Sequence, residues 1–177
     1  MKTPINMKTF ASASQQGVNI TSGSKNITVR NGTITNMGAE GILGWMGSFS
    51  FHDLNGRFED LAIDGNGALE HSTSDGLYVG PGVIVKNVTA TGNAGRGIVT
   101  SDGSDKNSVA RNNTGMGISA NESVISNATA RNNGSHGISA NRGSVSHSTS
   151  RENGGDGIRV DQKGCGFFLY VQQQYRR

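Results

Sequence analysis

The chain has 177 residues, of which 33% are hydrophobic and 27 are glycine, and its formal net charge is +3. A glycine-rich polar chain is often disordered, but here the apolar positions recur at a fixed interval, which excludes a low-complexity linker. The charge is too small to indicate nucleic acid as a partner, the single cysteine excludes an internal disulfide, and no apolar run is long enough to predict a membrane span.

The first segment, residues 1–16, has lysines but no apolar run long enough for a signal peptide. The residues alone leave the compartment undetermined, since the chain is either intracellular or has lost a leader. We expect this segment to stand apart from the repetitive region that follows it. It is a candidate for capping that region, because an open stack of strands exposes its core and its unpaired edges.

A repeat of twenty residues organises the next region, residues 17–164. Its marker is a Gly-Ile pair, which recurs as Gly97-Ile98, Gly117-Ile118, Gly137-Ile138 and Gly157-Ile158, with Gly76-Leu77 and Gly41-Ile42 before them. Two asparagine columns keep the same step, one at Asn93, Asn113, Asn133 and Asn153, and the other at Asn87, Asn107, Asn127 and, in the fourth place, His147. Apolar and polar residues alternate over short stretches, which predicts strands rather than helices.

Each short strand of such a repeat can pair only with its counterpart in the next repeat. The sequence therefore predicts an all-β parallel solenoid, with about three strands in each coil and coils about 4.8 Å apart. We expect the asparagines to occupy left-handed corners and to form side-chain ladders, and the glycines to lie where the chain bends too sharply for a Cβ. One interior column reads Val85, Asp105, Ile125 and Val145, so Asp105 is its single misfit.

Two segments depart from the repeat. Residues 43–58 hold the single tryptophan, Trp45, together with His52 and three phenylalanines. These aromatics either stack on sugar rings from a lateral loop, or they pack against the flank of the solenoid or fill a wide coil. The apolar segment 165–177, which begins at Cys165, either closes the C-terminal end, pairs with another subunit in a homo-oligomer, or belongs to a longer parent chain.

Three stretches, NITVRNGTITNMGAEGI, NVTATGNAGRGI and GSVSHSTSRENGGDGI, resemble coils of the right-handed parallel β-helix proteins of the pectate-lyase-like superfamily. The resemblance covers Val18 to Val160. It implies a right-handed parallel β-helix of about seven coils and an extracellular location. Members of this group include polysaccharide lyases, hydrolases, esterases, epimerases, phage tailspikes and adhesins, so the fold leaves the chemistry open.

From the resemblance we expect recognition or processing of an extended, acidic polysaccharide along the flank of the helix. If the chain is an enzyme, a polysaccharide lyase, a glycoside hydrolase and a carboxylic ester hydrolase all remain open. The alternative is a non-catalytic structural or adhesive module, such as a spike or a segment of a surface protein. The residues themselves indicate no cofactor, and Ca²⁺ is implied by the resemblance to lyases alone.

The strongest binding candidate is a column of three arginines, Arg111, Arg131 and Arg151, which are twenty residues apart. They alternate with small residues that we place inward, so we expect the arginines to point outward along one face. Such a column suits the regularly spaced charges of an acidic polysaccharide, and the alternative is a solvated basic face. The rings of Trp45 and Tyr78 are further candidates for ligand binding.

The catalytic candidates are ionisable residues near the Gly-Ile marker. The position before the glycine varies, and reads Asp75, Arg96, Met116, His136 and Asp156. His136 and Asp156 are expected to be neighbours, and such a pair either acts as a general base or serves the structure alone. For the early acidic residues Asp64 and Asp75, the resemblance implies a hydrolytic pair or Ca²⁺ ligands. The stretch STSDGLYV is similar to the Asp-Gly turn of polygalacturonase-like members, but their companion motifs are absent.

Overall fold

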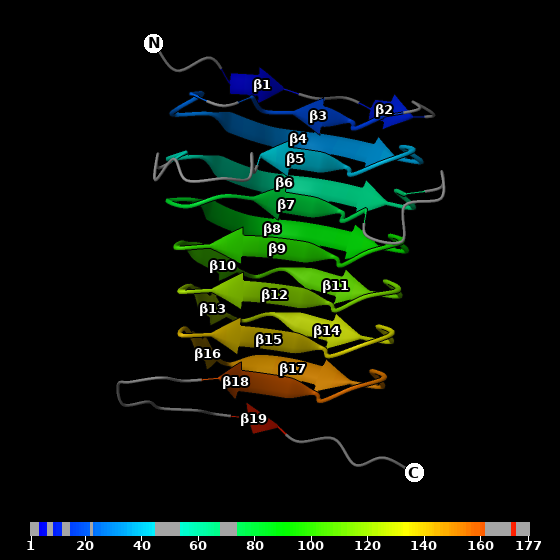
Figure 1. Cartoon of the computed structure of the whole chain (residues 1–177), viewed down its shortest axis with the longest axis vertical. Coiled ribbons are helices and arrows are strands. Elements are labelled where there is room, and N and C mark those ends of the chain that lie inside the picture. The colour runs from blue at the N-terminus through cyan, green and yellow to red at the C-terminus, as the bar shows by residue number, and fades with distance from the viewer. Residues whose placement is uncertain are drawn as a thin grey trace.

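The structure is a computed structural model that describes residues 4–6, 9–11, 15–21, 23–44, 54–67, 74–161 and 171–172. This part of the chain forms strands and turns and contains no helix. Its strands make two parallel sheets, stacked coil upon coil into a solenoid (Figure 1). Trp45, His52 and Cys165 lie outside the described residues, so the expectations that rest on them stay predictions.

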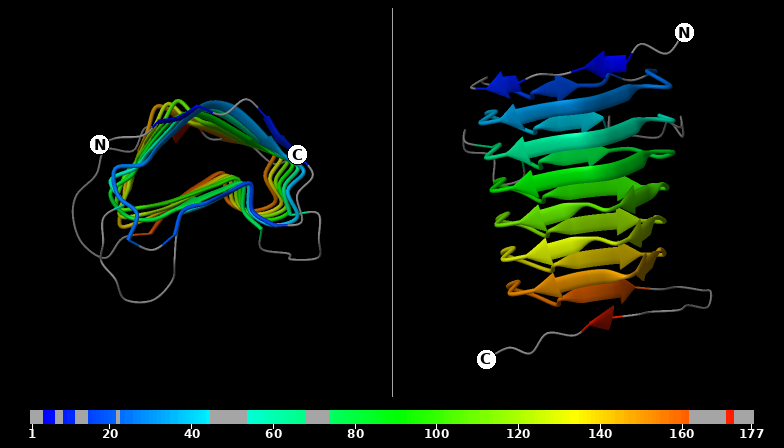
Figure 2. Two further views of the ribbon diagram at one scale, coloured as in Figure 1. Left: turned by 90° about the horizontal axis from the view of Figure 1, so that it is seen from above. Right: turned by 180° about the vertical axis from the view of Figure 1, so that it is seen from behind.

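The larger sheet has twelve strands and the smaller sheet has seven. The strands of the larger sheet are β1 (Pro4–Asn6), β2 (Thr9–Ala11), β4 (Thr28–Thr35), β6 (Arg57–Asp64), β8 (Ile84–Thr91), β10 (Ser104–Lys106), β11 (Val109–Arg111), β13 (Val124–Ser126), β14 (Thr129–Arg131), β16 (Ser144–Ser146), β17 (Ser148–Arg151) and β19 (Val171–Gln172). Those of the smaller sheet are β3 (Val18–Asn19), β5 (Ile42–Gly44), β7 (Leu77–Val79), β9 (Ile98–Ser101), β12 (Ile118–Asn121), β15 (Ile138–Asn141) and β18 (Ile158–Asp161). Viewed along the stack, successive coils superpose (Figure 2).

The twenty-residue repeat sets the register between coils. Ile118 on β12 lies opposite Ile98 on β9 and Ile138 on β15. Residues at the same position of successive repeats are therefore neighbours in space, and we call such a set a column. The prediction of a parallel β-solenoid with ladders between its coils is confirmed. Strands from both outer segments join the larger sheet, since β1 and β2 pair with β4, and β19 pairs with β17.

The number of strands in a coil differs along the stack. From β9 to β17 each coil has three short strands, as the sequence predicts. Farther toward the N-terminus, β4, β6 and β8 are each eight residues long, and β8 pairs with both β10 and β11. The two kinds of coil share a left-handed corner, because Asn87 within β8 and Asn107 after β10 have φ angles of 53° and 58°.

Alternation along the strands fills the interior with apolar side chains. On β6, Phe58, Leu61 and Ile63 are buried, whereas Asp60 and Asp64 are exposed. The interior column that contains Ile63 is buried throughout and reads Ile34, Ile63, Ala90, Ala110, Ala130 and Ser150. Its side chains therefore change from large to small toward the C-terminal end.

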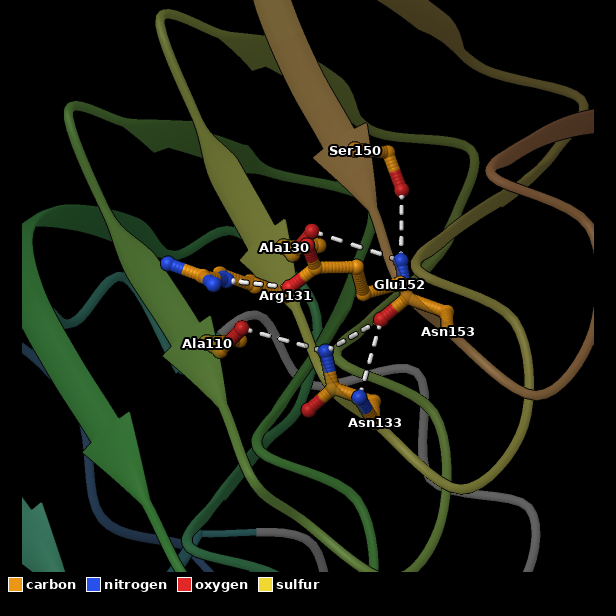
Figure 3. A network of polar contacts seen from close by, with 7 residues as sticks. All are labelled: Ala110, Ala130, Arg131, Asn133, Ser150, Glu152 and Asn153. Atoms are coloured by element: carbon orange, nitrogen blue, oxygen red, sulfur yellow. Dashed lines mark hydrogen bonds and ion pairs between the residues drawn. The ribbon is translucent and has the colours of Figure 1, made fainter. Parts of the chain in front are cut away.

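Asparagine side chains join the coils at one corner. Nδ2 of Asn113 donates to Oδ1 of Asn133 at 3.0 Å. Nδ2 of Asn133 donates to Oδ1 of Asn153 at 2.9 Å, and Figure 3 shows this second bond. These oxygens also accept the backbone N–H groups of Asn113 and Asn133, and Asn133 Nδ2 also donates to the Ala110 carbonyl at 3.1 Å. Hydrogen bonding of this kind makes the burial of amides tolerable. The members of this asparagine ladder are Asn66, Asn93, Asn113, Asn133 and Asn153.

At this corner the ladder and the left-handed backbone belong to adjacent residues, which differs from our expectation. The left-handed residues are Asn112 and Asn132, with φ angles of 56° and 54°, one position before the ladder asparagines. At the exposed corner both roles fall on the same residues, as expected. There Asn107 and Asn127 have φ angles of 58° and 53°, and Asn127 Nδ2 donates to Asn107 Oδ1 at 3.3 Å.

The glycines of the Gly-Ile marker allow close approach between coils. A Cβ on Gly117 would lie 2.5 Å from the carbonyl oxygen of Gly137 and 2.6 Å from Nδ2 of Asn133. Both distances are far shorter than the usual contact of a carbon atom. This glycine therefore makes room for the asparagine ladder, and our expectation of a bend too sharp for a Cβ is wrong for this column, since Gly117 has no left-handed φ.

Candidate ligand-binding face

The arginine column, Arg111, Arg131 and Arg151, lies at the ends of β11, β14 and β17. The three arginines are opposite one another in register and all are exposed, as the sequence predicts. Successive side chains of a strand point to opposite faces of the sheet. The small residue before each arginine is buried, so the arginine points outward. Toward the N-terminus the same column continues through Thr91 and Asp64.

Neighbouring side chains hold two of the three guanidinium groups. Arg111 Nε donates to Thr91 Oγ1 at 3.3 Å, and Arg131 Nε donates to Glu152 Oε2 at 2.6 Å (Figure 3). Within the described part of the chain, no hydrogen bond or ion pair holds the guanidinium group of Arg151. The side chains of Arg131 and Glu152 are 44% and 46% exposed, so their ion pair is worth at most about 1 kcal/mol. A carboxylate ligand can therefore compete with Glu152.

A second column of basic residues lies on the same sheet. Arg30, Lys86 and Lys106 are exposed and share one register position on β4, β8 and β10, with Glu59 between the first two. Acidic residues are fewer on this sheet: apart from the buried Asp105, those on its strands are Glu59, Asp60 and Asp64, all on β6. Positive charge therefore prevails on the outer face from β8 to β17.

Asp75 and Arg96 form an ion pair beside the smaller sheet, where Asp75 comes just before β7 and Arg96 just before β9. The Asp75 side chain is 2% exposed, and its oxygens accept hydrogen bonds from Arg96 Nη2 at 2.7 Å, Arg96 Nε at 3.1 Å and the Arg96 backbone N–H at 2.7 Å. The guanidinium also lies over the Tyr78 ring, 5.3 Å from its centre. Burial lowers the pKa of Arg96, but the hydrogen bond and the charge of Asp75, together with Tyr78, outweigh it, so the pKa is raised overall. These contacts favour a structural role for Asp75, and Arg96 covers one face of Tyr78.

His136 and Asp156 are neighbours, as their column predicts. The backbone N–H of Asp156 donates to Nδ1 of His136 at 2.9 Å, and a carboxylate oxygen of Asp156 lies 3.5 Å from the same nitrogen. A ring nitrogen that accepts a hydrogen bond carries no proton, so the carboxylate cannot orient the neutral imidazole through Nδ1. This geometry favours the structural alternative, in which His136 ties two coils together.

The catalytic candidates do not meet in one place. Asp64 is exposed within the arginine column, whereas Asp75 and His136 belong to another column and are separated by Arg96 and Met116. Three coil steps correspond to about 14 Å at the usual strand spacing. In the described ranges, no three His, Cys, Asp or Glu side chains are grouped so that they could hold a metal ion.

Sequence reasoning missed two features of these columns. It did not identify the Asp75–Arg96 ion pair, although opposite charges at successive positions of one column are a usable signal. It also did not place Asp64 in the arginine column, because Asp64 and its register partner Thr91 are 27 residues apart in the sequence. The repeat is longer there, so counting in steps of twenty cannot find the match.

No family model matches the chain, and a comparison with curated proteins finds no significant relative. The described residues contain no helix with the length and hydrophobicity needed to cross a membrane.

Proposed function

We propose that the chain is a right-handed parallel β-helix of the pectate-lyase-like type, with about seven coils, and that it binds an extended acidic polysaccharide along the arginine column. The observation that carries the proposal is the alignment of Arg111, Arg131 and Arg151, which are exposed and in register on one face. A ladder of identical cations is suited to a polymer that repeats an anionic group.

The polymer runs along the stack in this proposal, across the strands. The arginine stems are rooted about 4.8 Å apart, and a guanidinium can donate two parallel hydrogen bonds to one carboxylate. Thr91, next to Arg111 in the column, supplies a hydroxyl for a sugar. The second basic column adds a longer-range attraction for a polyanion, which salt weakens.

The test is calorimetric titration of the protein with polygalacturonate at low salt. We expect Arg131→Ala to weaken binding about fivefold, since it removes one exposed charge-assisted contact. Arg142→Ala is the matched control, because Arg142 is an exposed arginine that also pairs with a glutamate, Glu122, but lies outside the column. An equal loss in both variants would reduce the effect to net charge and contradict the proposal, as would equal affinity for the neutral polymer dextran.

A second candidate function is a non-catalytic structural or adhesive module. The regularity of the coils from β9 to β17 favours it, because a catalytic site usually disturbs the coils that form it. This alternative predicts no binding to acidic or neutral glycans and no turnover.

Processing of the polysaccharide, or hydrolysis of carboxylic esters, requires more than the arginine column. His136, Asp156, Asp75 and Asp64 stay the candidates for it, and of these only His136 and Asp156 are neighbours. Assays for unsaturated uronate products, for new reducing ends and for cleavage of model esters test these reactions. Turnover that His136→Ala abolishes, while polygalacturonate binding is kept, would establish catalysis.

A further inference from the structure

One acidic side chain interrupts the hydrophobic interior of the larger sheet. Asp105 on β10 is 0% exposed and lies opposite Val85 on β8 and Ile125 on β13. Val145 takes the same position in the following coil. Because β10 is paired along both edges, its backbone cannot turn the carboxyl outward without breaking the two ladders.

The carboxyl group makes no hydrogen bond in the interior, although the Ser108 hydroxyl lies near enough to affect its pKa. Both of its oxygens lack a hydrogen bond, and the nearby Ser108 hydroxyl accepts from the Val88 backbone N–H and donates to the Lys106 carbonyl instead. The same coil also buries the Thr100 hydroxyl without a partner, at a position where the next coil has Ala120. Burying an unpaired polar group is unfavourable, and burying an unpaired charge is much more so.

No opposite charge faces Asp105 from the strands packed around it. The buried residues of these strands are neutral: Val85, Val88 and Ala90 on β8, Ile125 on β13, Ile98, Val99 and Thr100 on β9, and Ile118 and Ala120 on β12. The nearest lysines in the sequence and register, Lys86 on β8 and Lys106 on β10 itself, are exposed on the outer face. The other buried carboxylate in the described ranges, Asp75, is paired with Arg96.

We propose that Asp105 is a pH-sensitive weak point in the middle of the solenoid, and that its ionisation loosens the coil made by β9, β10 and β11. A neutral carboxyl can stay among apolar side chains at a moderate cost. A carboxylate needs water, and water reaches this position when β10 separates from β8 or from β13. The proposal is independent of polysaccharide binding.

The direction of the pH effect follows from the two states of the chain. Burial raises the pKa of Asp105 from its ordinary 3.8 to about 7, and the Ser108 hydroxyl opposes this rise. Between these values the unfolded chain is ionised while the folded chain is protonated, so unfolding releases a proton and stability falls as the pH rises. Below pH about 4 both states are protonated and the penalty is absent, and above pH about 7 it is fully present.

The test compares urea unfolding of the wild type and Asp105→Asn from pH 4 to pH 8. The neutral amide removes the titration at similar volume. We expect the unfolding equilibrium constant of the wild type, relative to that of the variant, to rise about tenfold per pH unit up to pH 7, or about a thousandfold in all. Asp105→Val, which introduces the residue found at this position in neighbouring coils, should behave like Asp105→Asn and raise the urea midpoint most at pH 8.

A matched control separates this effect from general acid titration. Asp102 is an exposed carboxylate at the corner of the same coil, and Asp102→Asn should keep the pH profile of the wild type. Parallel profiles for the wild type, Asp105→Asn and Asp105→Val would overturn the proposal, since ionisation of Asp105 would then have no cost.

Hydrogen exchange tests where the structure loosens. At pH 8 we expect the amides of β10, β8 and β13 to exchange at least tenfold faster in the wild type than in Asp105→Asn, and the amides of β4 to exchange alike. Because both proteins are compared at one pH, intrinsic exchange rates cancel. Equal protection of β10 in the two proteins would overturn the local opening.

Discussion

The coils built on β4, β6 and β8 and the coils from β9 to β17 share one register but differ in the size of the side chains that fill one interior column. In the first group large side chains such as Phe58 and Ile63 fill the interior. In the second group the positions that match Ile63 hold small residues such as Ala130. Buried asparagines bond from coil to coil in both groups, from Asn66 onward. The difference teaches that one register and one asparagine ladder can enclose interiors of different volume.

The largest effect should come from removing volume in the first group. Phe58 and Val145 belong to one interior column, and both are buried. We expect Phe58→Ala to lower the free energy of unfolding by about 4 kcal/mol and Val145→Ala by about 2 kcal/mol, because the cost grows with the cavity that is left. Urea denaturation measures both, and equal losses would contradict the proposed division of the molecule.

The next effect concerns the asparagine ladder. Asn133→Ala leaves the Asn113 amide, the Ala110 carbonyl and Oδ1 of Asn153 each short of a hydrogen bond, and we expect a loss of about 3 kcal/mol. Asn153 is half-buried, so water can replace its bonds, and Asn153→Ala should cost about 1 kcal/mol. A smaller loss at Asn133 than at Asn153 in urea denaturation would show that the ladder does not stabilise the regular coils.

The smallest effect tests the close approach of coils. Gly117→Ala places a methyl group against the Gly137 carbonyl, and we expect it to lower the melting temperature and to cost about 2 kcal/mol. The matched control is Gly157→Ala, whose Cβ would meet no atom nearer than 3.7 Å, so its cost should stay below about 0.5 kcal/mol. Similar melting temperatures for the two variants would show that the coils can separate locally to admit a side chain.

The repeat made the register and the direction of the arginines predictable. A fixed step of twenty places Arg111 beside Arg131 in any parallel stack, and alternation with small residues turns both outward. The buried carboxyl was visible too, because Asp105 alone departs from an apolar column. These features depend on position along the chain, which the sequence contains directly.

Other features depend on distances between coils, which spacing does not contain. Repeat spacing does not show that Gly117 makes room for the ladder. Nor does it show that Asn112 takes the left-handed backbone while Asn113 forms the ladder. Both features depend on how closely two backbones approach. The sequence also did not predict β8 as one strand of eight residues. An asparagine such as Asn87 indicates a corner between two short strands, but here the strand continues through its left-handed backbone. The Nδ1 contact of His136 likewise needed three-dimensional geometry.

The near-identical coils have a consequence for assembly of the chain. In the native stack Ile98 pairs with Ile118, and Ile118 pairs with Ile138. If a folding chain left out residues 118–137, Ile98 would pair with Ile138, so that isoleucine would still lie opposite isoleucine. Mispaired species of this kind would therefore compete with the native pairing during folding. The same degeneracy makes the molecule adjustable, because deleting or duplicating one whole coil should give a shorter or longer protein of unchanged cross-section.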